Sequence, residues 1–334
     1  MSLILIDKPA GPTSHAVVSA IKRSLRADKV GHLGTLDPFA SGLLPVMVGN
    51  TSRLSDEAMQ GRKGYLFTIR FGQETDTLDP TGRVVAEANL PSENSLAQLT
   101  QVLNQFTGPI EQVPPVYSAL KMNGRPLYEH IRATGVLPAD IETKRRIVQV
   151  DTLEIINAGI HELTLRTVVS KGTYIRSLAR DIARALGSVG TCVQLRRECV
   201  EPWHVNHALK LSLDGSGRVV APSKEELLSY CHPPWSVAPE LARAIIPESL
   251  SPRLESGNAL SVHDTELIWE TDRPHVAHTE NPLSEKTMTV TEKNQRQGLS
   301  PLKIFLKNSN SLFLCEAICL DGEEWKIQPR KRIQ

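Results

Sequence analysis

A single acidic residue, Asp37, lies in the otherwise uncharged and largely apolar segment GHLGTLDPFASGLLPV (31–46). Glycines here let a ligand approach the backbone closely, and the proline after Asp37 favours an extended backbone at that residue. The apolar residues that follow raise the cost of an unpaired charge. The segment therefore predicts a carboxylate with a cationic partner or a catalytic role, although an aspartate beside a proline also commonly forms an Asx turn.

Two further aspartates, Asp76 and Asp79, lie in TDTLDPTG (75–82), which repeats the letters TLDP of the first segment. Paired carboxylates can hold Mg²⁺ in phosphoryl-transfer enzymes, so a metal-dependent phosphohydrolase is one alternative, and chelators would abolish its activity. However, the sequence contains no glycine-rich phosphate loop with its lysine. Asp-Pro-Thr-Gly is typical of a turn. Because the flanks of the two TLDP copies differ, we interpret the second copy as a turn and the repetition as coincidence.

The composition is that of a globular protein of one or two domains, with 334 residues, 40% of them hydrophobic and 22% charged. No apolar run approaches the roughly 18 residues that cross a membrane, and no basic segment precedes the short apolar run at the N-terminus, as a signal peptide would require. The five cysteines include no Cys-x-x-Cys, which argues against a disulfide framework and a structural zinc site. We expect a cytoplasmic protein without membrane contact, and we expect it to be a monomer.

The charge is uneven along the chain although the net charge is only +1. Residues 101–200 contain 13 basic and 9 acidic side chains, whereas residues 201–300 contain 9 basic and 14 acidic ones. The last residues, 301–334, are basic again, with 6 against 4. This gradient is compatible with a face that contacts phosphates, and equally with an ordinary solvated surface.

Hydrophobic spacing predicts the main elements of the fold. The expected helices are 14–25, with Ser14 as a possible cap, 95–106 and 173–187; the expected strands are 64–72, 145–156 and 161–170. Because strands and helices do not alternate strictly, we expect an α+β fold with a mixed or antiparallel sheet. Four prolines and two glycines mark 108–126 as a long loop or clamp.

The pattern changes after about residue 245. Short apolar segments joined by polar turns predict a small β-rich domain there, and Cys315 and Cys319 fall in one of its strands. We expect one domain over 1–245 and a second over 246–334. The polar segment 264–300 shows little periodicity and is expected to be a flexible insertion.

Six segments of the first domain resemble the TruB family of tRNA pseudouridine synthases in order and spacing. They are KPAGPTS (8–14), GHLGTLDPFASGLLPV (31–46), KGYLFTIRFGQETDTLDPTG (63–82), PPVYSALKMNGRPLYEHIR (114–132), SKGTYIRSLARDIARALG (170–187) and LRR (195–197). The last 89 residues or so are similar to the small PUA-like RNA-binding domain of that family, interrupted by 264–300.

The resemblance implies an isomerase that flips uridine 55 out of the tRNA T arm, breaks its N1–C1′ bond and rejoins the base through C5. It implies that Asp37 is the catalytic aspartate, that Arg176 pairs with it, and that Tyr65 stacks on the target base. Whether Asp37 attacks C1′ or removes the C2′ proton stays open. The substrate contacts that it implies are His32, Tyr117, Lys121, Tyr174 and Leu195. It implies tRNA as the partner and no metal or organic cofactor.

A binding protein that helps tRNA fold is the other alternative, because the same side chains serve binding and chemistry. Intact Asp37, Tyr65 and Arg176 favour the enzyme.

Overall fold

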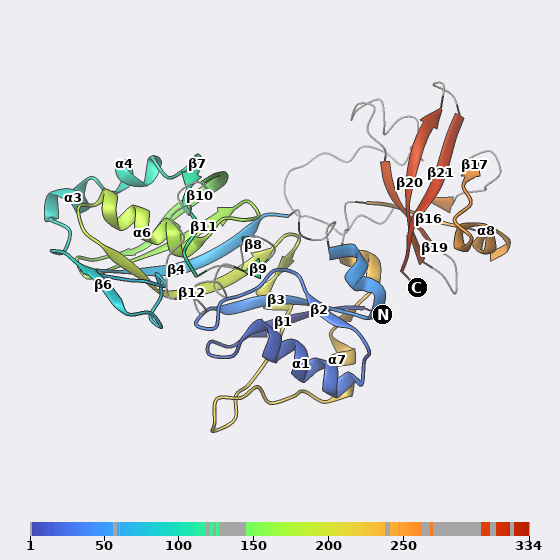
Figure 1. The fold of residues 1–334 in the computed structure, drawn as a ribbon, viewed down its shortest axis with the longest axis horizontal. Helices are drawn as coiled ribbons and strands as arrows, with labels where there is room; N and C mark the ends of the chain where they lie inside the picture. Colours follow the sequence, from blue (N-terminus) through green and yellow to red (C-terminus); the bar gives the residue numbers. More distant parts are fainter. Residues whose placement is uncertain are drawn as a thin grey trace. The chain divides into compact units, whose positions relative to one another are not determined.

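The computed structural model describes residues 2–55, 59, 61–117, 121–122, 125–126, 145–237, 241–246, 248–261, 268–269, 302–307, 312–320 and 324–333. The chain divides into two compact units (Figure 1). The larger unit comprises Ile4–Val46 and Met59–Tyr230, and the smaller one comprises Met1–Leu3, Met47–Ala58 and Cys231–Gln334. The assignment of a catalytic domain to 1–245 and of an RNA-binding domain to 246–334 stays a prediction.

One mixed sheet forms the framework of the larger unit, with its strands in the order β14-β1-β3-β12-β4-β11-β10-β7. The bounds are β1 Ser2–Lys8, β3 Ser41–Val48, β4 Lys63–Phe71, β7 Gly108–Gln112, β10 Arg146–Ala158, β11 Glu162–Val169, β12 Gly190–Val200 and β14 Leu209–Lys210. Short strands join it at the side, among them β2 Val30–His32 on β3 and β13 Trp203–His204 on β12. The expected α+β fold with a mixed sheet is confirmed.

Both parallel and antiparallel pairs occur in this sheet. Strand β12 pairs antiparallel with β4 and parallel with β3, and β4, β11, β10 and β7 continue as antiparallel neighbours. The predicted strands 64–72, 145–156 and 161–170 correspond to β4, β10 and β11. The segment 108–126 begins as strand β7 rather than as loop, because Gly108–Gln112 pairs with Arg146–Val150.

The helices of the larger unit are α1 Ser14–Leu25, α3 Glu93–Ala97, α4 Leu99–Asn104, α6 Ile175–Ala185 and α7 Lys224–Ser229. Helix α6 packs on β12 and β4, and α1 lies beside α7 (Figure 1). The helix expected over 95–106 is two short helices. The cap of α1 is Thr13, whose Oγ1 accepts a hydrogen bond from the amide of Ala16; the hydroxyl of Ser14 is used elsewhere.

Small elements complete the larger unit: β5 Gln73–Thr75 pairs with β6 Val84–Glu87, β8 Lys121–Met122 pairs with β9 Arg125–Pro126, and η3 Val205–His207 is a 3₁₀ turn. The segment between β5 and β6, residues 76–83, is a turn, as the sequence predicts. Leu78 adopts a left-handed backbone there, with a φ of 61°. Such a backbone is rare for a branched side chain and usually marks a functional or strained site.

A second mixed sheet, with the order β17-β21-β20-β19-β16-β18, forms the smaller unit. Its strands are β16 Ala242–Ile245, β17 Leu260–Ser261, β18 Ile268–Trp269, β19 Leu302–Lys307, β20 Leu312–Leu320 and β21 Glu324–Arg332; short elements are η1 Gly49–Leu54, β15 Cys231–His232, η4 Pro234–Val237, η5 Glu248–Leu250 and α8 Ser251–Glu255. The strand expected around Cys315 and Cys319 is β20. Apart from β18, the predicted insertion 264–300 lies outside the described residues.

Candidate active site

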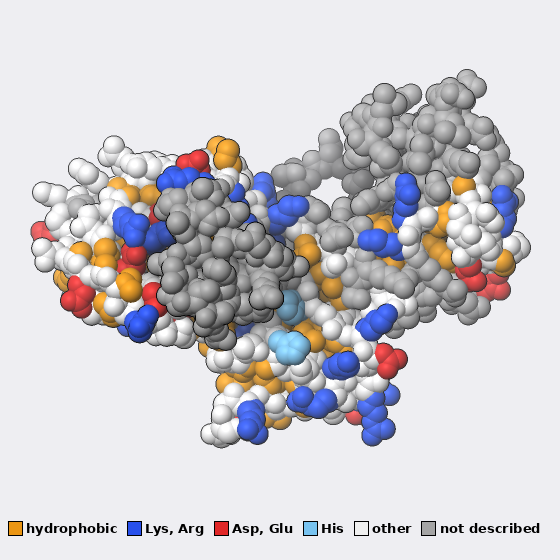
Figure 2. All heavy atoms as spheres, in the orientation of Figure 1, with side chains coloured by type: hydrophobic (Ala, Val, Ile, Leu, Met, Phe, Trp, Pro, Cys, Tyr) orange, Lys and Arg blue, Asp and Glu red, His pale blue; other side chains and the backbone are white. Residues whose placement is uncertain are grey.

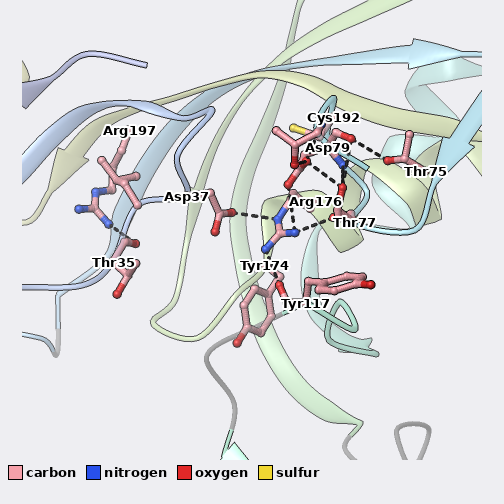
Figure 3. Close-up of polar contacts among 12 residues, drawn as sticks. Thr35, Asp37, Thr75, Thr77, Asp79, Tyr117, Tyr174, Arg176, Cys192 and Arg197 are labelled. Atoms are coloured by element: carbon pink, nitrogen blue, oxygen red, sulfur yellow. Dashed lines mark hydrogen bonds and ion pairs between the residues drawn. The ribbon is translucent and has the colours of Figure 1, made fainter. Parts of the chain in front are cut away.

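Arg176, in the first turn of α6, joins the two TLDP segments into one site. Its Nε lies 2.9 Å from Oδ2 of Asp37, and its Nη1 lies 3.3 Å from Oδ2 of Asp79. The guanidinium is almost fully buried, with 5% of the side chain exposed, whereas Asp37 keeps 34%. Figure 3 shows the two carboxylates converging on the one arginine. The pairing of Asp37 with Arg176 that the sequence predicts is therefore present. The two TLDP segments, whose similarity the sequence analysis interprets as coincidence, contact the same arginine.

Arg176 also donates to two backbone carbonyls. Nη1 donates to Thr77 O at 2.6 Å, and Nη2 donates to Tyr117 O at 3.0 Å. The turn that carries Asp79 is in turn held by strand β12, because the amide of Cys192 donates to Leu78 O at 3.1 Å. A buried guanidinium with two carboxylates and two carbonyls around it has little freedom to move, so it fixes the position of Asp37.

Asp79 and Asp37 differ in how many of their oxygen atoms are already bound. Oδ1 of Asp79 accepts hydrogen bonds from the Thr77 hydroxyl, the Thr81 amide and the Thr81 hydroxyl, and its Oδ2 faces Arg176. Asp37 uses Oδ2 for Arg176, and no donor among the described residues contacts its Oδ1. Asp37 is thus anchored by one oxygen and has the other available for chemistry, whereas Asp79 is fully occupied in holding the site.

The loop that carries Asp37 is fixed from three sides. Ser14 accepts a hydrogen bond from the amide of Leu36 and donates one to its carbonyl, both at 2.9 Å. The buried Lys8 donates to Pro12 O at 2.8 Å and to Pro38 O at 3.3 Å, as well as to its neighbour's carbonyl. Lys8 and Ser14 are the first and last residues of KPAGPTS, so this motif places the residue before Asp37 and the residue after it.

Arg197 holds the start of the same loop. It is 1% exposed, and its guanidinium donates to the carbonyls of Leu43, Gly34 and Thr35 at 2.8, 3.0 and 3.5 Å. The neighbouring strand must come very close at Gly42, which has a φ of 105° and where a Cβ would overlap the carbonyl of Arg197. Only glycine fits such a position without strain.

Burial raises the pKa of the Asp37 carboxyl above its usual value; Arg176 opposes this rise, the charge of Asp79 adds to it, and Lys8 opposes it. Burial also lowers the pKa of Lys8 to about 8, against the effect of Asp37 and together with that of Arg197. A carboxylate with a raised pKa is a better base and nucleophile than an ordinary one.

Tyr65 and Leu195 lie on the same face of the sheet as Arg197. Tyr65 is paired with Arg197 across β4 and β12, and Leu195 is paired with Phe67. Directly opposed residues, and residues two apart, point to the same face of a sheet. Since Arg197 reaches the loop that carries Asp37, Tyr65 and Leu195 face the side on which this loop lies. Both side chains are buried.

His32 ends strand β2, five residues before Asp37, and is half-buried. Burial lowers its pKa, and the charges of Arg197 and His15 lower it further. Its Nδ1 is buried and has no hydrogen-bond partner among the described residues. A neutral imidazole with an unsatisfied ring nitrogen can accept or donate a hydrogen bond to a ligand.

Tyr174 directly precedes α6, and Gln112 fixes its backbone. The amide of Tyr174 donates to Oε1 of Gln112 at 2.8 Å, and its carbonyl accepts from Nε2 at 3.1 Å. Tyr174 and Tyr117 lie on the same side of Arg176 (Figure 3). Lys121 lies in strand β8, of which the structure describes only the backbone. The sequence analysis did not predict the contacts that Asp79, Lys8, Ser14 and Gln112 make with these residues and their backbone.

Within the described residues, no group of three or more His, Cys, Asp or Glu side chains is placed to hold a metal ion. Nor is any helix in the described part of the chain long and apolar enough to cross a membrane. Asp76, the other member of the suggested metal pair, contacts Arg83 instead, through its Oδ2 at 3.6 Å.

The fold and the sequence both match known proteins. The fold resembles that of a chain in the crystal structure of a Cbf5-Nop10-Gar1 complex, with a TM-score of 0.64, 23% identity, and coverage of 100% of this chain and 85% of that one. A chain from the structure of an H/ACA RNP bound to a substrate RNA containing 2′-deoxyuridine is similar, with a TM-score of 0.62 and 20% identity. These similarities concern the fold.

The sequence identifies the family. Residues 22–175 match the family described as "TruB family pseudouridylate synthase (N terminal domain)". The protein named tRNA pseudouridine synthase B of Bordetella avium is 43% identical over 211 residues, which cover 63% of this chain and 84% of that protein. The protein of the same name from Psychrobacter cryohalolentis is 33% identical over 348 residues, 99% of this chain and 93% of that protein. The family match and these relatives place the chain among the pseudouridine synthases, which are isomerases. This chain belongs to the TruB family.

Proposed function

We propose that this protein converts uridine 55 in the T arm of tRNA to pseudouridine, with Asp37 as the catalytic residue. The observation that carries the proposal is the unequal use of the two aspartates on Arg176. Asp79 is occupied by hydroxyl, amide and guanidinium donors, whereas Oδ1 of Asp37 has no donor among the described residues. The relatives named tRNA pseudouridine synthase B support tRNA as the substrate.

The chemistry requires an ionised carboxylate at the sugar. The N1–C1′ bond of uridine breaks, the base turns, a C5–C1′ bond forms, the proton on C5 leaves and N1 takes up a proton. Positive charge develops at C1′ as the first bond breaks, and a carboxylate beside it stabilises that charge or bonds to it, as in glycosidases. Attack of Asp37 on C1′ and removal of the C2′ proton both begin from the same free Oδ1.

The flipped base needs an apolar and aromatic pocket to offset the cost of leaving its stack, which amounts to a few kcal/mol. Tyr65, Tyr174 and Leu195 supply such side chains, with Tyr65 against the base and close to its C5. His32 contacts the RNA where the nucleotide leaves the stack, and Tyr117 and Lys121 belong to the RNA-clamping segment. The smaller unit contributes a PUA-like RNA-binding domain within 246–334. The protein works as a cytoplasmic monomer without a metal or organic cofactor.

The surface of the larger unit supports RNA binding. In Figure 2, basic side chains outnumber acidic ones on the visible face around α1. The sequence there, from 22 to 29, contains Lys22, Arg23, Arg26 and Lys29 against Asp28 alone. Such a surface attracts the phosphates of RNA, and we therefore expect tRNA affinity to fall steeply with added salt.

The test is tritium release from an unmodified tRNA transcript that carries [5-³H]uridine, without added metal. We expect release by the wild type and none by Asp37→Asn, with tRNA affinity retained by the variant. Hydrolysis of a phosphate ester that a chelator abolishes, without any tritium release, would instead favour the phosphohydrolase alternative. No release by either protein, despite tight tRNA binding, would refute the synthase and leave the tRNA-folding function.

A further inference from the structure

Arg146, the first residue of β10, has two guanidinium nitrogens whose hydrogen-bonding capacity is unused. Its Nε and Nη2 are buried, and neither has a hydrogen-bond partner among the described residues. No carboxylate in the described part of the chain pairs with it. Buried polar groups almost always have partners, and a buried charge without one is costly. The missing partner is therefore expected from outside the described residues.

The guanidinium lies against the candidate base pocket. Its Cζ is 4.7 Å from the centre of the Tyr174 ring, a cation–π contact. Arg146 is also paired across the sheet with Gln112, the residue whose amide fixes the backbone of Tyr174. Strands β7 and β10 thus hold Tyr174 and Arg146 in fixed positions beside each other.

The orientation of the guanidinium narrows the possible ligand. Nη1 faces the chain at Gly172, where a Cβ would lie 3.5 Å from it. The two unsatisfied atoms, Nε and Nη2, share the opposite edge, from which two N–H bonds point in parallel. This edge matches two oxygen atoms of a carboxylate or phosphate. Uracil does not match it, because its two carbonyl oxygens are separated by an N–H donor.

We propose that Arg146 binds a phosphodiester of the RNA strand next to the target uridine, with both non-bridging oxygens on Nε and Nη2. The proposal rests on the function proposed above and adds a phosphate-binding residue to it. Phosphate contacts set the register of a bound nucleic acid. A phosphate held beside the Tyr174 ring places the sugar of the adjoining nucleotide at a fixed distance from the pocket. Guanine, through its O6 and N7, also fits an arginine edge, but it carries no charge to balance the buried cation.

The neighbouring residue supplies a matched control. Arg145 is exposed and pairs with Glu111 through Nη1 at 3.3 Å. We would measure the affinity of the full chain for a synthetic T-arm stem-loop, using Arg146→Gln, Arg146→Lys and Arg145→Gln. We expect Arg146→Gln to weaken binding roughly 10-fold or more and Arg145→Gln to change it little. The slope of log affinity against log salt should fall by about 0.7 to 0.9 in Arg146→Gln, as for one lost phosphate contact.

A set of stem-loops, each with one neutral methylphosphonate at a different linkage around the target uridine, identifies the phosphate that Arg146 contacts. At one linkage, the neutral group should weaken the wild type about as much as Arg146→Gln does and should add little to the variant. Additive losses at every linkage would overturn the proposal. A loss that appears instead on replacing one guanine by 7-deazaguanine would also overturn it and assign the edge to a base.

Arg146→Lys tests whether the loss of affinity in Arg146→Gln arises only because the structure around Tyr174 is disturbed. Lysine keeps a positive charge near Tyr174 but lacks the two-N–H edge. We expect its unfolding temperature to match the wild type while its affinity stays several-fold weaker. Wild-type affinity in Arg146→Lys would show that the arginine serves only to support Tyr174. If the wild type releases no tritium, the proposed function fails, but these binding measurements still decide the phosphate contact.

Discussion

Asp79 contacts Nη1 of Arg176 at 3.3 Å while Asp37 occupies Nε of the same guanidinium. One buried arginine therefore serves two carboxylates, and the three groups together carry a net negative charge. Because Asp79 receives three further hydrogen bonds, it is the better stabilised anion of the two. We infer that Asp79 fixes Arg176 and that Arg176 in turn fixes Asp37.

Asp79→Asn tests this order. The amide keeps the size of the side chain but removes the charge that holds Nη1, so Arg176 shifts and Asp37 loses its position. A displacement of about 1 Å at a reacting group can cost about 10²-fold in rate. We expect the rate constant of tritium release under single-turnover conditions to fall by about that factor, with tRNA affinity nearly unchanged.

Asp76→Asn is the matched control, since Asp76 lies in the same turn but pairs with the exposed Arg83. It accepts a hydrogen bond from the Arg83 amide, which an asparagine oxygen can also accept. We expect a change of less than about threefold, because exposed ion pairs contribute little. Equal losses in this rate constant for the two variants would mean that the conformation of the turn, and not the charge of Asp79, positions Asp37.

This relationship also shows how far the sequence alone could lead. The motif around Asp37 indicated a carboxylate in need of a cation, and Arg176 was found through a family resemblance. The sequence indicates a turn residue at Asp79, with a metal ligand as the alternative. The turn is real, but its partner lies 97 positions away in the chain. Local turn chemistry says nothing about such a contact. The repeated TLDP was the one signal that could have pointed to it.

Other parts of the site were hidden for a similar reason. Ser14 is a good helix cap by type, yet Thr13 caps α1 and Ser14 holds the loop 22 residues later. The arginines at 176, 180 and 184 repeat like a solvated helix face. In fact Arg176 is buried, and Arg184 pairs with Glu74 on β5. Hydrophobic spacing predicts which elements form, whereas the partners of polar residues depend on the tertiary fold.

Asp37→Asn should leave the protein at least as stable as the wild type at neutral pH. The pKa of Asp37 is raised in the folded state, so the folded protein binds this proton more tightly than the unfolded chain does. At pH values above its pKa in the folded protein, the ionised carboxylate therefore lowers the free energy of unfolding. This destabilisation is lost as the pH falls through that pKa to the pKa of Asp37 in the unfolded chain. Because Asp37 is about one-third exposed, we expect a small effect.

Thermal unfolding of both proteins at neutral pH and near pH 4 measures this. The unfolding temperature of Asp37→Asn should equal or exceed that of the wild type at neutral pH, and the difference should shrink at acid pH. A variant that unfolds clearly earlier than the wild type at neutral pH would contradict the raised pKa and make Asp37 a stabilising residue.

Ser14→Ala should separate the placement of the Asp37 loop from substrate binding. The substitution leaves the buried amide and carbonyl of Leu36 without their partner. We expect a loss of about 2 kcal/mol in the free energy of unfolding and a kcat about 10-fold lower, with KM for tRNA unchanged. Urea unfolding and steady-state tritium release measure the two effects.

Thr13→Ala is the control for Ser14→Ala, because Thr13 caps the same helix without touching the loop. Loss of a helix cap costs about 1 kcal/mol, so stability should fall while kcat is maintained. If Thr13→Ala lowers kcat as much as Ser14→Ala does, the rate follows general stability and the contact with Leu36 has no special role.

Lys63 should make tRNA binding depend on pH on the alkaline side. Burial, together with the charges of Arg197 and Lys171, lowers its pKa to about 8, and no carboxylate among the described residues pairs with it. Its Cε lies 3.9 Å from the position of a Cβ on Gly34, beside the Asp37 loop. A lowered pKa means that the charge is present below about pH 8 and lost above it, so an RNA phosphate near this loop is held less tightly at pH 9 than at pH 7. We expect wild-type tRNA affinity to fall across this range.

Lys63→Arg keeps its charge throughout, because arginine does not lose its proton in proteins. Its affinity for tRNA should therefore fall less than that of the wild type between pH 7 and 9, while the two proteins bind similarly at pH 6.5. Filter binding at constant ionic strength compares them. Lys8 also has a pKa of about 8 and is retained in both proteins, so only the difference between the two pH profiles reports on Lys63. Identical profiles for the two proteins would remove Lys63 from the RNA-binding surface.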